Sequence, residues 1–444
     1  MTPDLCGTDG DLGVDLSTDA CLKCNVCLTL CPVARVTDLF PGPKYVGPQA
    51  QRFRAGRSLP VQTPGVPSVK SPDVTVDWCS GCGWCTASCP AGVKIAELNS
   101  RSRARLKAGR RPKLRDWGLG QTDLVGRVGQ LTWPISNWAL ANRPIRAAME
   151  LAFGIHRHAP FPKFGRRTLQ SKYRRRPRNS TLPGPEEAVV YFHGCSANYY
   201  EMHVAEATIE VLKRNGLQVI VPEQVCCGLP LISNGIYAEA RQKARRNIEL
   251  LAPYARQGYR IVGTSTSCTH TIKAEYREML DLCDDDATLV ANMTWDICEL
   301  LADLHDKGRL NTRFGELKEE VAYHAPCQLR SQGIGLPALD LLGLVPGMRA
   351  SDMDHDCCGI AGTYGMKKEK YPIAMAVGEP LFERIRQSGV AVAACDSETC
   401  RWQIQAATRI PVRHPVEILC EAYRAADRLN AAALETPPEG KEQR

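Results

Sequence analysis

The chain has 444 residues, 21 of them cysteine, and a formal net charge of +8. Its length exceeds what one hydrophobic core usually serves, so we expect two or three domains and exclude a mini-protein that depends on disulfides for its stability. No run approaches the roughly 18 uncharged apolar residues of a transmembrane helix, since even the most apolar candidate, residues 128–142, has a central proline.

The first residues, MTPDLCGTDGDLGVDL, are acidic and lack the basic start and apolar run of a secretory signal peptide. We therefore expect a cytoplasmic protein whose thiols stay reduced. Cysteines at this density in a reducing compartment are more often metal ligands than disulfide partners. The cysteines are therefore the first candidates for functional residues.

A cysteine-rich head over residues 1–99 contains one motif twice. Residues 21–32 read CLKCNVCLTLCP and residues 79–90 read CSGCGWCTASCP, both C-x2-C-x2-C-x3-C-P. In two-cluster ferredoxins, three cysteines of each run bind one [4Fe–4S] cluster and the fourth binds the other cluster. We predict two such clusters in a ferredoxin-like head, the first held by Cys21, Cys24, Cys27 and Cys89 and the second by Cys79, Cys82, Cys85 and Cys31. Zinc is the weaker alternative, because zinc sites seldom need a third cysteine at this spacing, and Cys6 lies outside the pattern.

Residues 100–185 form a basic segment, with 20 Lys or Arg against three acids, whereas the rest of the chain is acidic on balance. Arginine-rich stretches at 101–115 and 163–178 flank an apolar stretch that contains Trp133, Trp138, Leu140, Leu151 and Phe153. This pattern fits a segment that lies in a membrane interface, where anionic lipids attract basic side chains. A solvated linker whose arginines contact an acidic partner subunit is the alternative. No nucleic-acid-binding motif accompanies the charge.

The tail, residues 186–430, contains an internal repeat. Cys195 and Cys327 are 132 residues apart, as are Cys268 and Cys400, and the pair Cys226–Cys227 recurs 131 residues later as Cys357–Cys358. Apolar β-type runs, such as AVVYF at 188–192, alternate with helical patterns in both repeats. This predicts α/β repeats with parallel strands, in which ligands collect beyond the carboxyl ends of the strands. We place the repeats at 186–310 and 311–430, and expect residues 431–444 to be disordered.

Each repeat contains the triplet Cys-Cys-Gly, at 226–228 and 357–359. Adjacent Cα atoms lie about 3.8 Å apart, too close for an unstrained disulfide, so we interpret each pair as two thiolates aimed at one metal centre. The glycine allows close backbone approach or a positive φ. Four thiolates suffice for a [4Fe–4S] cluster, which gives the sets Cys195, Cys226, Cys227 and Cys268, and Cys327, Cys357, Cys358 and Cys400. Buried structural cysteines, or a cluster in one repeat only, are the alternatives.

The remaining cysteines and two histidines of the tail are expected to be structural. Cys283, Cys298 and Cys420 lie in helical patterns and are predicted to be in the core. His193 and His324, just before the first cysteine of each repeat, are each predicted to bond a backbone carbonyl. Tuning a cluster, or relaying protons to a quinone, is the alternative for these two histidines.

Several stretches together resemble one family. They include CLKCNVCLTLCPVARV at 21–36, LTWPISNWALANRPIR at 131–146, HAPCQLRSQGIG at 324–335 and CCGIAGTYGMKKEKY at 357–371. In this order they resemble the iron–sulfur subunit, designated C, of the anaerobic, quinone-linked glycerol-3-phosphate dehydrogenase over nearly the whole chain. The resemblance implies an iron–sulfur electron-transfer subunit, peripheral on the inner face of the cell membrane. It would take electrons from a separate flavoprotein dehydrogenase and pass them to menaquinone.

Related chains occur in glycolate oxidase, lactate utilisation and heterodisulfide reductase systems. Two alternatives therefore stay open: an iron–sulfur subunit of a glycolate or lactate oxidase, and a heterodisulfide-reductase-like enzyme acting at the Cys-Cys-Gly clusters. No G-x-G-x-x-G fingerprint opens a βαβ unit, so we expect no flavin in this chain. The heterodisulfide reductase motif ends in C-x2-C, where this chain has Ser265 and Ser397. The resemblance therefore favours four-thiolate clusters, with Cys395 as a candidate extra ligand.

Overall fold

The tail contains two four-stranded sheets in which every strand pairing is parallel. The computed structural model describes residues 20–51, 75–173, 182–353 and 357–435. The strands are β1 (Ala188–Phe192), β2 (Gln218–Ile220), β3 (Arg260–Gly263), β4 (Thr294–Asp296), β5 (Glu320–Tyr323), β6 (Arg349–Asp352), β7 (Val392–Ala394) and β8 (Val412–Arg413). The two sheets have the same strand order, β2-β1-β3-β4 and β6-β5-β7-β8. The predicted α/β repeats with parallel strands are thus confirmed.

Burial explains the sequence of the central strands. All five residues of β1, AVVYF, are buried, as expected for a parallel strand covered by helices on both faces. Val190 of β1 pairs with Ile261 of β3, and Ala322 of β5 pairs with Ala393 of β7. Strands of this kind are continuous apolar runs, which is why the sequence revealed them.

Helices connect the strands of both repeats. In the first repeat they are α11 (Gly194–Tyr199), α12 (Met202–Arg214), α13 (Leu229–Ser233), α14 (Tyr237–Ala255), α15 (Thr266–His270), η4 (Thr271–Glu275), α16 (Tyr276–Glu278), α17 (Asp285–Asn292) and α18 (Ile297–Asp306). In the second they are α19 (Cys327–Arg330), α20 (Pro337–Gly343), η5 (Tyr364–Met366), α21 (Tyr371–Gln387), α22 (Glu398–Thr408) and α23 (Pro415–Glu435). Helix α23 continues past residue 430, where a disordered end was expected to begin, and residues 436–444 lie outside the described residues.

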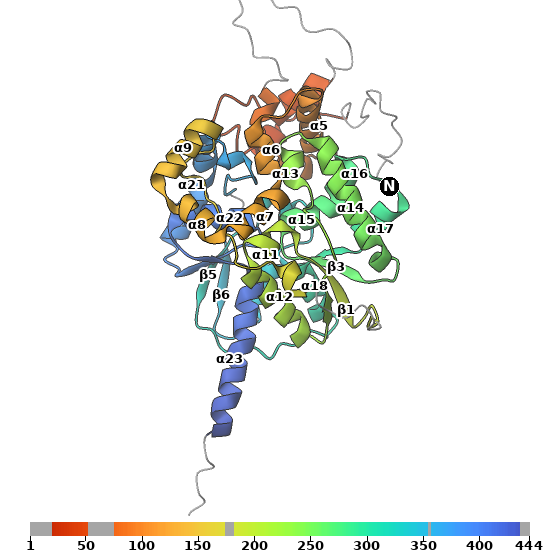
Figure 1. The fold of residues 1–444 in the computed structure, drawn as a ribbon, viewed down its shortest axis with the longest axis vertical. Helices are drawn as coiled ribbons and strands as arrows, with labels where there is room; N and C mark the ends of the chain where they lie inside the picture. Colours follow the sequence, from red (N-terminus) through yellow and green to blue (C-terminus); the bar gives the residue numbers. More distant parts are fainter. Residues whose placement is uncertain (1–19, 52–74, 174–181, 354–356, 436–444) are drawn as a thin grey trace, which may run out of the picture.

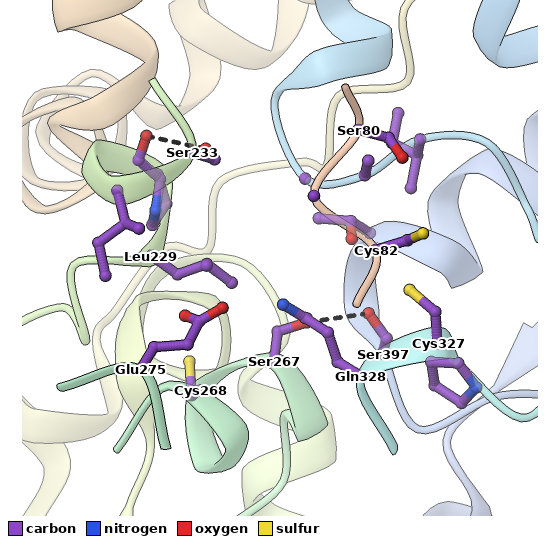
Figure 2. A pocket seen from close by; sticks show the side chains of 18 of the residues that line it. Ser80, Cys82, Leu229, Ser233, Ser267, Cys268, Glu275, Cys327, Gln328 and Ser397 are labelled. Atoms are coloured by element: carbon purple, nitrogen blue, oxygen red, sulfur yellow. Dashed lines mark hydrogen bonds between the residues drawn. The ribbon is translucent and has the colours of Figure 1, made fainter. Parts of the chain in front are cut away.

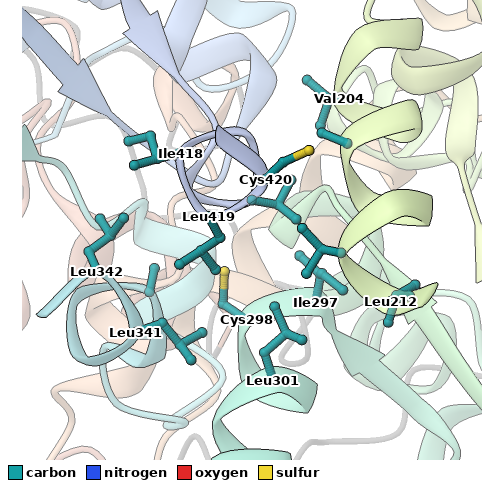
Figure 3. Close-up of a cluster of buried hydrophobic side chains, with 14 of the residues drawn as sticks. Val204, Leu212, Ile297, Cys298, Leu301, Leu341, Leu342, Ile418, Leu419 and Cys420 are labelled. Carbon is teal, nitrogen blue, oxygen red and sulfur yellow. The ribbon is translucent and has the colours of Figure 1, made fainter. Parts of the chain in front are cut away.

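The two repeats share one hydrophobic core (Figure 3). Helix α12 of the first repeat packs against α23 of the second, and α18 of the first packs against α20 of the second. Leu212, Leu301, Leu341 and Leu419 come from these four helices and are at most 1% exposed. Each such leucine contributes about 1.5–3 kcal/mol by burial. The repeats are therefore held together as one unit by helices that pack across the contact.

The head and the basic segment are helical. The head contains α1 (Val26–Thr29), η2 (Tyr45–Gln49), η3 (Val76–Trp78) and α4 (Trp84–Ala87), and the basic segment contains α5 (Ile95–Lys107), α6 (Leu114–Gly120), α7 (Thr122–Leu131), α8 (Trp133–Ala141), α9 (Arg143–Phe153) and α10 (Leu169–Tyr173). Helix α5 crosses the boundary expected at residue 99. Figure 1 shows α5 and α6 at one end of the molecule and α23 projecting from the other.

The basic segment packs on the first repeat. Helix α6 contacts α13, and α7 contacts α11. A Cβ at Gly126 of α7 would clash with the ring of Tyr199 in α11, so this glycine allows the two helices to approach closely. Residues 114–131 of this segment are therefore packed against the first repeat.

Helices α7, α8 and α9 expose a large apolar surface, which we call the docking face. It comprises Leu124, Val125, Val128, Leu131, Trp133, Ile135, Trp138, Leu151 and Phe153, each at least 37% exposed. Asn142 caps α9 by accepting a hydrogen bond from the Ile145 amide, and Pro144 follows within the first turn, so the break between α8 and α9 is fixed locally. Within the described residues, no helix is both long and apolar enough to cross a membrane.

Candidate iron–sulfur sites

The first four predicted head ligands line one cavity. Cys21, Cys24, Cys27 and Cys89 all border it. The loop that carries the first three is tight, because Lys23 and Asn25 have φ of 57° and 68°, a conformation that few residues other than glycine adopt. Gly81 and Gly83, with φ of 74° and 82°, occupy the matching positions of the second motif. Both loops therefore turn in the same way, as a shared ligand geometry requires.

The second head set lines a separate cavity. Cys31, Cys79, Cys82 and Cys85 border it. Burial raises the pKa of Cys31 to about 11, and burial together with Cys82 raises the pKa of Cys85 well above its ordinary value. Buried thiols this close together cannot all ionise unless a cation replaces their protons. The donor set fits a metal centre with four thiolate ligands.

Cationic side chains gather beside the second set. Arg103 of α5 is 4% exposed and donates hydrogen bonds to the carbonyl oxygens of Val76, Cys79 and Ser233. Lys370 Nζ donates to the Asp77 carboxylate at 3.0 Å. Burial lowers the pKa of Lys370 to about 7, against the attraction of Asp77. The guanidinium of Arg103 at this position favours a bound cluster with net negative charge.

All eight cysteines of the two tail sets line one further cavity, between the repeats (Figure 2). Cys195 lies in α11 and Cys268 in α15, whereas Cys327 lies in α19 and Cys400 in α22. These helices follow the carboxyl ends of strands, as predicted. Cys82 of the head lines the same cavity. The cavity therefore joins the three cysteine-bearing parts of the chain.

Within each tail set the thiols contact one another. Cys358 Sγ donates to Cys400 Sγ across 3.1 Å. Hydrogen bonds from Cys195 and Cys227 lower the pKa of Cys226. Hydrogen bonds from Cys327 and Cys358 lower the pKa of Cys357 in the same way. Hydrogen bonds among the thiols thus favour a thiolate within each set, and thiolate is the form that binds iron.

The glycine of each triplet has a backbone role. Gly228 and Gly359 have φ of 92° and 80°. Their amides donate to Cys226 Sγ at 3.5 Å and Cys357 Sγ at 3.3 Å. A Cβ at Gly359 would clash with the Ala374 carbonyl oxygen. Positive φ, the first reason expected from the sequence, is therefore present at both glycines, and close approach, the second, is present at Gly359.

The two serines and Cys395 differ in their placement. Ser265 Oγ accepts a hydrogen bond from the Cys268 amide at 3.4 Å and so caps α15. Ser397 lines the shared cavity, and its Oγ lies 3.5 Å from Ser267 Oγ. Cys395 is fully buried, and burial together with a hydrogen bond to Cys400 raises its pKa. The contact with Cys400 keeps Cys395 a candidate extra ligand.

The two histidines behave differently from each other. His193 Nδ1 lies 2.7 Å from the Gly194 carbonyl oxygen, as predicted. The prediction is wrong for His324, whose ring lies with Cys358 and Cys400 so that their ligand atoms are all within 4.8 Å of one another. Its Nδ1 has no hydrogen-bond partner in the described part of the chain. The spacing H-x-x-C was the available signal, and only the fold shows which cysteines the ring meets.

A buried cluster of two aspartates and one cysteine was not predicted from the sequence. Asp296, Cys298 and Asp396 have ligand atoms within 4.8 Å of one another. Burial and the charge of Asp396 raise the pKa of Asp296 well above its ordinary value. The Asp296 carboxylate caps α18, and Tyr323 donates to Asp396 Oδ2 at 2.6 Å. This cluster joins the two repeats.

The predicted core positions of the other cysteines are partly correct. Cys298 in α18 and Cys420 in α23 are buried, as expected. Cys283 instead lies in the loop before α17 and is partly exposed. Cys6 lies outside the described residues.

Two family models match the chain. A 4Fe-4S dicluster domain model matches residues 17–93, and a cysteine-rich CCG domain model matches residues 189–273 and again 321–405. The matched ranges contain all sixteen predicted cluster cysteines and Cys395. The chain is therefore an iron–sulfur protein with a dicluster head and two CCG domains.

Known proteins resemble between about half and nine-tenths of the chain. The subunit designated C of the anaerobic glycerol-3-phosphate dehydrogenase of Escherichia coli K12 is 34% identical over 92% of this chain and 99% of its own. The subunit designated D of the dihydromethanophenazine:CoB–CoM heterodisulfide reductase of Methanosarcina acetivorans is 24% identical over 82% of each chain. Lactate utilization protein A of an Exiguobacterium strain is 29% identical over 54% of this chain and 99% of its own. The extent and level of the first match show that this chain belongs to the same family as that glycerol-3-phosphate dehydrogenase subunit.

Proposed function

We propose that the chain passes electrons to menaquinone from a flavoprotein that oxidises glycerol 3-phosphate to dihydroxyacetone phosphate. That oxidation releases two electrons and two protons, and menaquinone takes up two of each to become menaquinol. Iron–sulfur clusters supply one-electron transfer. The protein contributes the thiolates that fix the position of each cluster and the charges that set its potential.

One observation carries this proposal: Cys82 lines both the second head cavity and the cavity shared by the two tail sets. The second head set and the two tail sets, twelve cysteines in all, therefore form a continuous series from the head to the repeats. We assign one [4Fe–4S] cluster to each head set, with Cys21, Cys24, Cys27 and Cys89, and Cys31, Cys79, Cys82 and Cys85. One or two further clusters belong to the CCG repeats. No flavin site is assigned to this chain.

The docking face is our candidate for contact with the cytoplasmic side of the cell membrane. Leu131, Ile135, Trp138 and Leu151 are 61–87% exposed, and the segment that carries them is strongly basic. Exposed tryptophan and leucine beside arginine suit the interface of an anionic bilayer. Such a contact brings the chain to the quinone pool.

Iron and sulfide analysis of anaerobically purified protein tests the cluster assignment. About eight irons correspond to the head alone, about twelve to one tail cluster and about sixteen to two, at four irons for each [4Fe–4S] cluster. We expect twelve or sixteen. A content of eight irons would show that the repeats hold no cluster and take no part in the proposed electron transfer.

Reconstitution with the partner flavoprotein tests the function. Glycerol 3-phosphate should reduce the clusters, and a menaquinone analogue added afterwards should reoxidise them. Electron paramagnetic resonance and visible absorbance measure both steps. Glycolate and lactate, supplied with the same flavoprotein, serve as controls. Reduction by one of these instead of glycerol 3-phosphate would reassign the chain to a glycolate or lactate oxidase.

The shared cavity favours a second candidate, a heterodisulfide-reductase-like enzyme. Both tail sets face this cavity, whose lining also includes Glu275 and Gln328. An enzyme acting between two clusters needs such an arrangement. We expect the purified chain, given a reduced viologen, to show no turnover with heterodisulfides. Turnover would make this candidate the better one.

A further inference from the structure

A cavity beside the docking face is lined by arginine. It lies between the end of α8, the start of α9 and the residue after α22, and its lining comprises Leu140, Ala141, Arg143, Arg146, Arg157, His158, Ala159, Phe161 and Arg409. No acidic side chain is among these residues. None of the residues here belongs to a predicted cluster site. The cavity therefore needs its own explanation.

Arg146 is a buried cation without an anion. It is 6% exposed, and its Nε and Nη2 donate to the carbonyl oxygens of Arg157, His156 and Ala159 at 2.7–3.1 Å. Its guanidinium lies over the Phe161 ring, 4.6 Å from the centroid. The remaining Nη1 has no hydrogen-bond partner, and no carboxylate pairs with Arg146, within the described residues. Burial accordingly lowers the pKa of Arg146 with no charge to oppose it.

The neighbouring arginines add to this excess of positive charge. Arg157 pairs with the Glu150 carboxylate. Arg143 and Arg409 are exposed and make no ion pair within the described ranges. In that part of the chain, three of the four guanidinium groups at the cavity therefore lack a counter-charge. An uncompensated buried charge such as that of Arg146 is costly, and a bound anion would remove the cost.

The backbone of Arg409 also indicates a constraint. Arg409 ends α22 with φ of 66°, the conformation at which helices usually place glycine. An L side chain is strained in this conformation, because its Cβ crowds the following carbonyl oxygen. Backbone strain of this kind is commonly found at ligand-binding and other functional sites. Here that side chain is a guanidinium at the mouth of the cavity.

We propose that this cavity binds the phosphate group of an anionic phospholipid. The planar guanidinium groups suit phosphate oxygens. The apolar lining from Leu140 and Phe161, and the neighbouring exposed Trp138 and Leu151, suit a phosphate that carries acyl chains. This proposal rests on the membrane contact proposed above, and it adds a specific lipid site to a diffuse attraction.

The test compares two double variants of the full-length, cluster-loaded chain. Arg143→Gln with Arg409→Gly removes two charges from the cavity, and glycine at position 409 also relieves the backbone strain. Arg110→Gln with Arg111→Gln removes two exposed charges from the same basic segment, away from the cavity lining. Binding to mixed phosphatidylglycerol and phosphatidylcholine vesicles is measured by co-sedimentation.

We expect the cavity variant to bind these vesicles at least about tenfold more weakly than the Arg110 and Arg111 variant does, because it loses hydrogen bonds to phosphate as well as charge. Unchanged or raised melting temperature would show that the cavity variant is folded. Equal weakening of both variants would overturn the site and leave only diffuse charge attraction.

Soluble phosphates identify the source of the ligand. Inorganic phosphate and glycerol 3-phosphate should give no binding heat in titration calorimetry. Neither of them should displace the chain from vesicles in co-sedimentation. Competition by either would overturn the lipid assignment and give the cavity to a soluble phosphate. With glycerol 3-phosphate and the partner flavoprotein as the source of electrons, reduction of a water-soluble quinone by the cavity variant should stay at the wild-type rate. A loss of this activity would show that the substitutions act on electron transfer rather than on lipid binding, which would also overturn the proposal.

Discussion

At Gly359 the chain passes directly against the carbonyl oxygen of Ala374 in α21. Gly228, the equivalent residue of the first repeat, shares the positive φ, but a Cβ there would lie 3.4 Å from the Ala240 carbonyl oxygen, an ordinary contact. Two triplets with the same sequence therefore differ in how well their glycine tolerates an added Cβ. The difference comes from the helix that follows each triplet and not from the cysteines.

Gly359→Ala is expected to destabilise the protein by about 3 kcal/mol or more, because it adds overlap to backbone strain. Gly228→Ala should cost about 1–2 kcal/mol, from strain alone. Anaerobic thermal unfolding, together with iron analysis, measures both effects. Gly362→Ala is the matched control, since Gly362 has φ of 61° and open space around it. Equal losses at Gly359 and Gly362 would contradict the role of the Ala374 contact.

Arg103 is expected to raise the reduction potential of the second head cluster. Its buried guanidinium bonds the Cys79 carbonyl, and a positive charge stabilises the reduced, more negative cluster. Arg103→Gln should lower that potential by tens of millivolts, on the order given by Coulomb's law at a protein dielectric. Redox titration followed by electron paramagnetic resonance measures the shift.

Arg101→Gln is the control for this prediction. Arg101 lies on the same helix but pairs with Asp281 and the Glu278 carbonyl of the first repeat. It should leave the potential almost unchanged. The same shift in both variants would assign the effect to overall charge, whereas loss of the cluster signal in Arg103→Gln alone would show a structural role.

At the scale of elements, α7, α8 and α9 combine two functions. Their inner residues pack on the first repeat, as Gly126 does against Tyr199, while Leu131 and Leu151 point outward at 78% and 87% exposure. A helix that packs on one face and exposes leucine and tryptophan on another is unusual for a surface that meets only water. The sequence located this segment, but only the fold separates its inner residues from its outer ones.

Trp138→Ser with Leu151→Ser is expected to weaken vesicle binding by one to two orders of magnitude. Full burial of the two side chains would be worth about 3–6 kcal/mol, or two to four orders of magnitude, and an interface buries them only in part. Stability should change by about 0.5 kcal/mol or less, since both residues are exposed. Vesicle co-sedimentation and thermal unfolding give the two values.

Leu429→Ser provides the control for the docking face. Leu429 is 62% exposed on α23, outside the basic segment. Its substitution should leave vesicle binding unchanged. Equal effects at Leu429 and at the docking face would show that exposed apolar area in general, rather than this face, drives the binding.

At the scale of the whole molecule, local patterns revealed the repeats but not how they join. The cysteine offsets of 131 and 132 residues and the apolar run of β1 were enough to predict two α/β repeats. The packing of α23 and α18 against helices of the other repeat was not predictable, because helical periodicity shows that a face is apolar but not which helix covers it. The position of Cys82 at two cavities and the meeting of His324 with Cys400 depend on the same long-range packing.

His414 links the two repeats and should make the stability of the fold depend on pH. Its Nε2 donates to the Thr264 carbonyl oxygen at 2.9 Å, and its Nδ1 accepts from the Val416 amide at 3.0 Å, so the ring is neutral in the fold. Burial lowers its pKa well below the ordinary value of 6.5. The unfolded chain therefore binds a proton at this residue, below about pH 6.5, that the folded chain does not bind.

Stability is accordingly expected to be full above about pH 6.5 and to fall by up to about 1.4 kcal/mol for each unit below it, from this residue alone. His414→Gln should cost about 1–2 kcal/mol at pH 7.5, through weakened hydrogen bonds. It should also reduce the slope of stability between pH 7 and pH 5. Urea unfolding across this range, on anaerobic protein, measures both quantities. His305→Gln, at an exposed histidine of α18, is the control. An unchanged slope in His414→Gln would show that protonation of His414 does not cause the loss of stability at low pH.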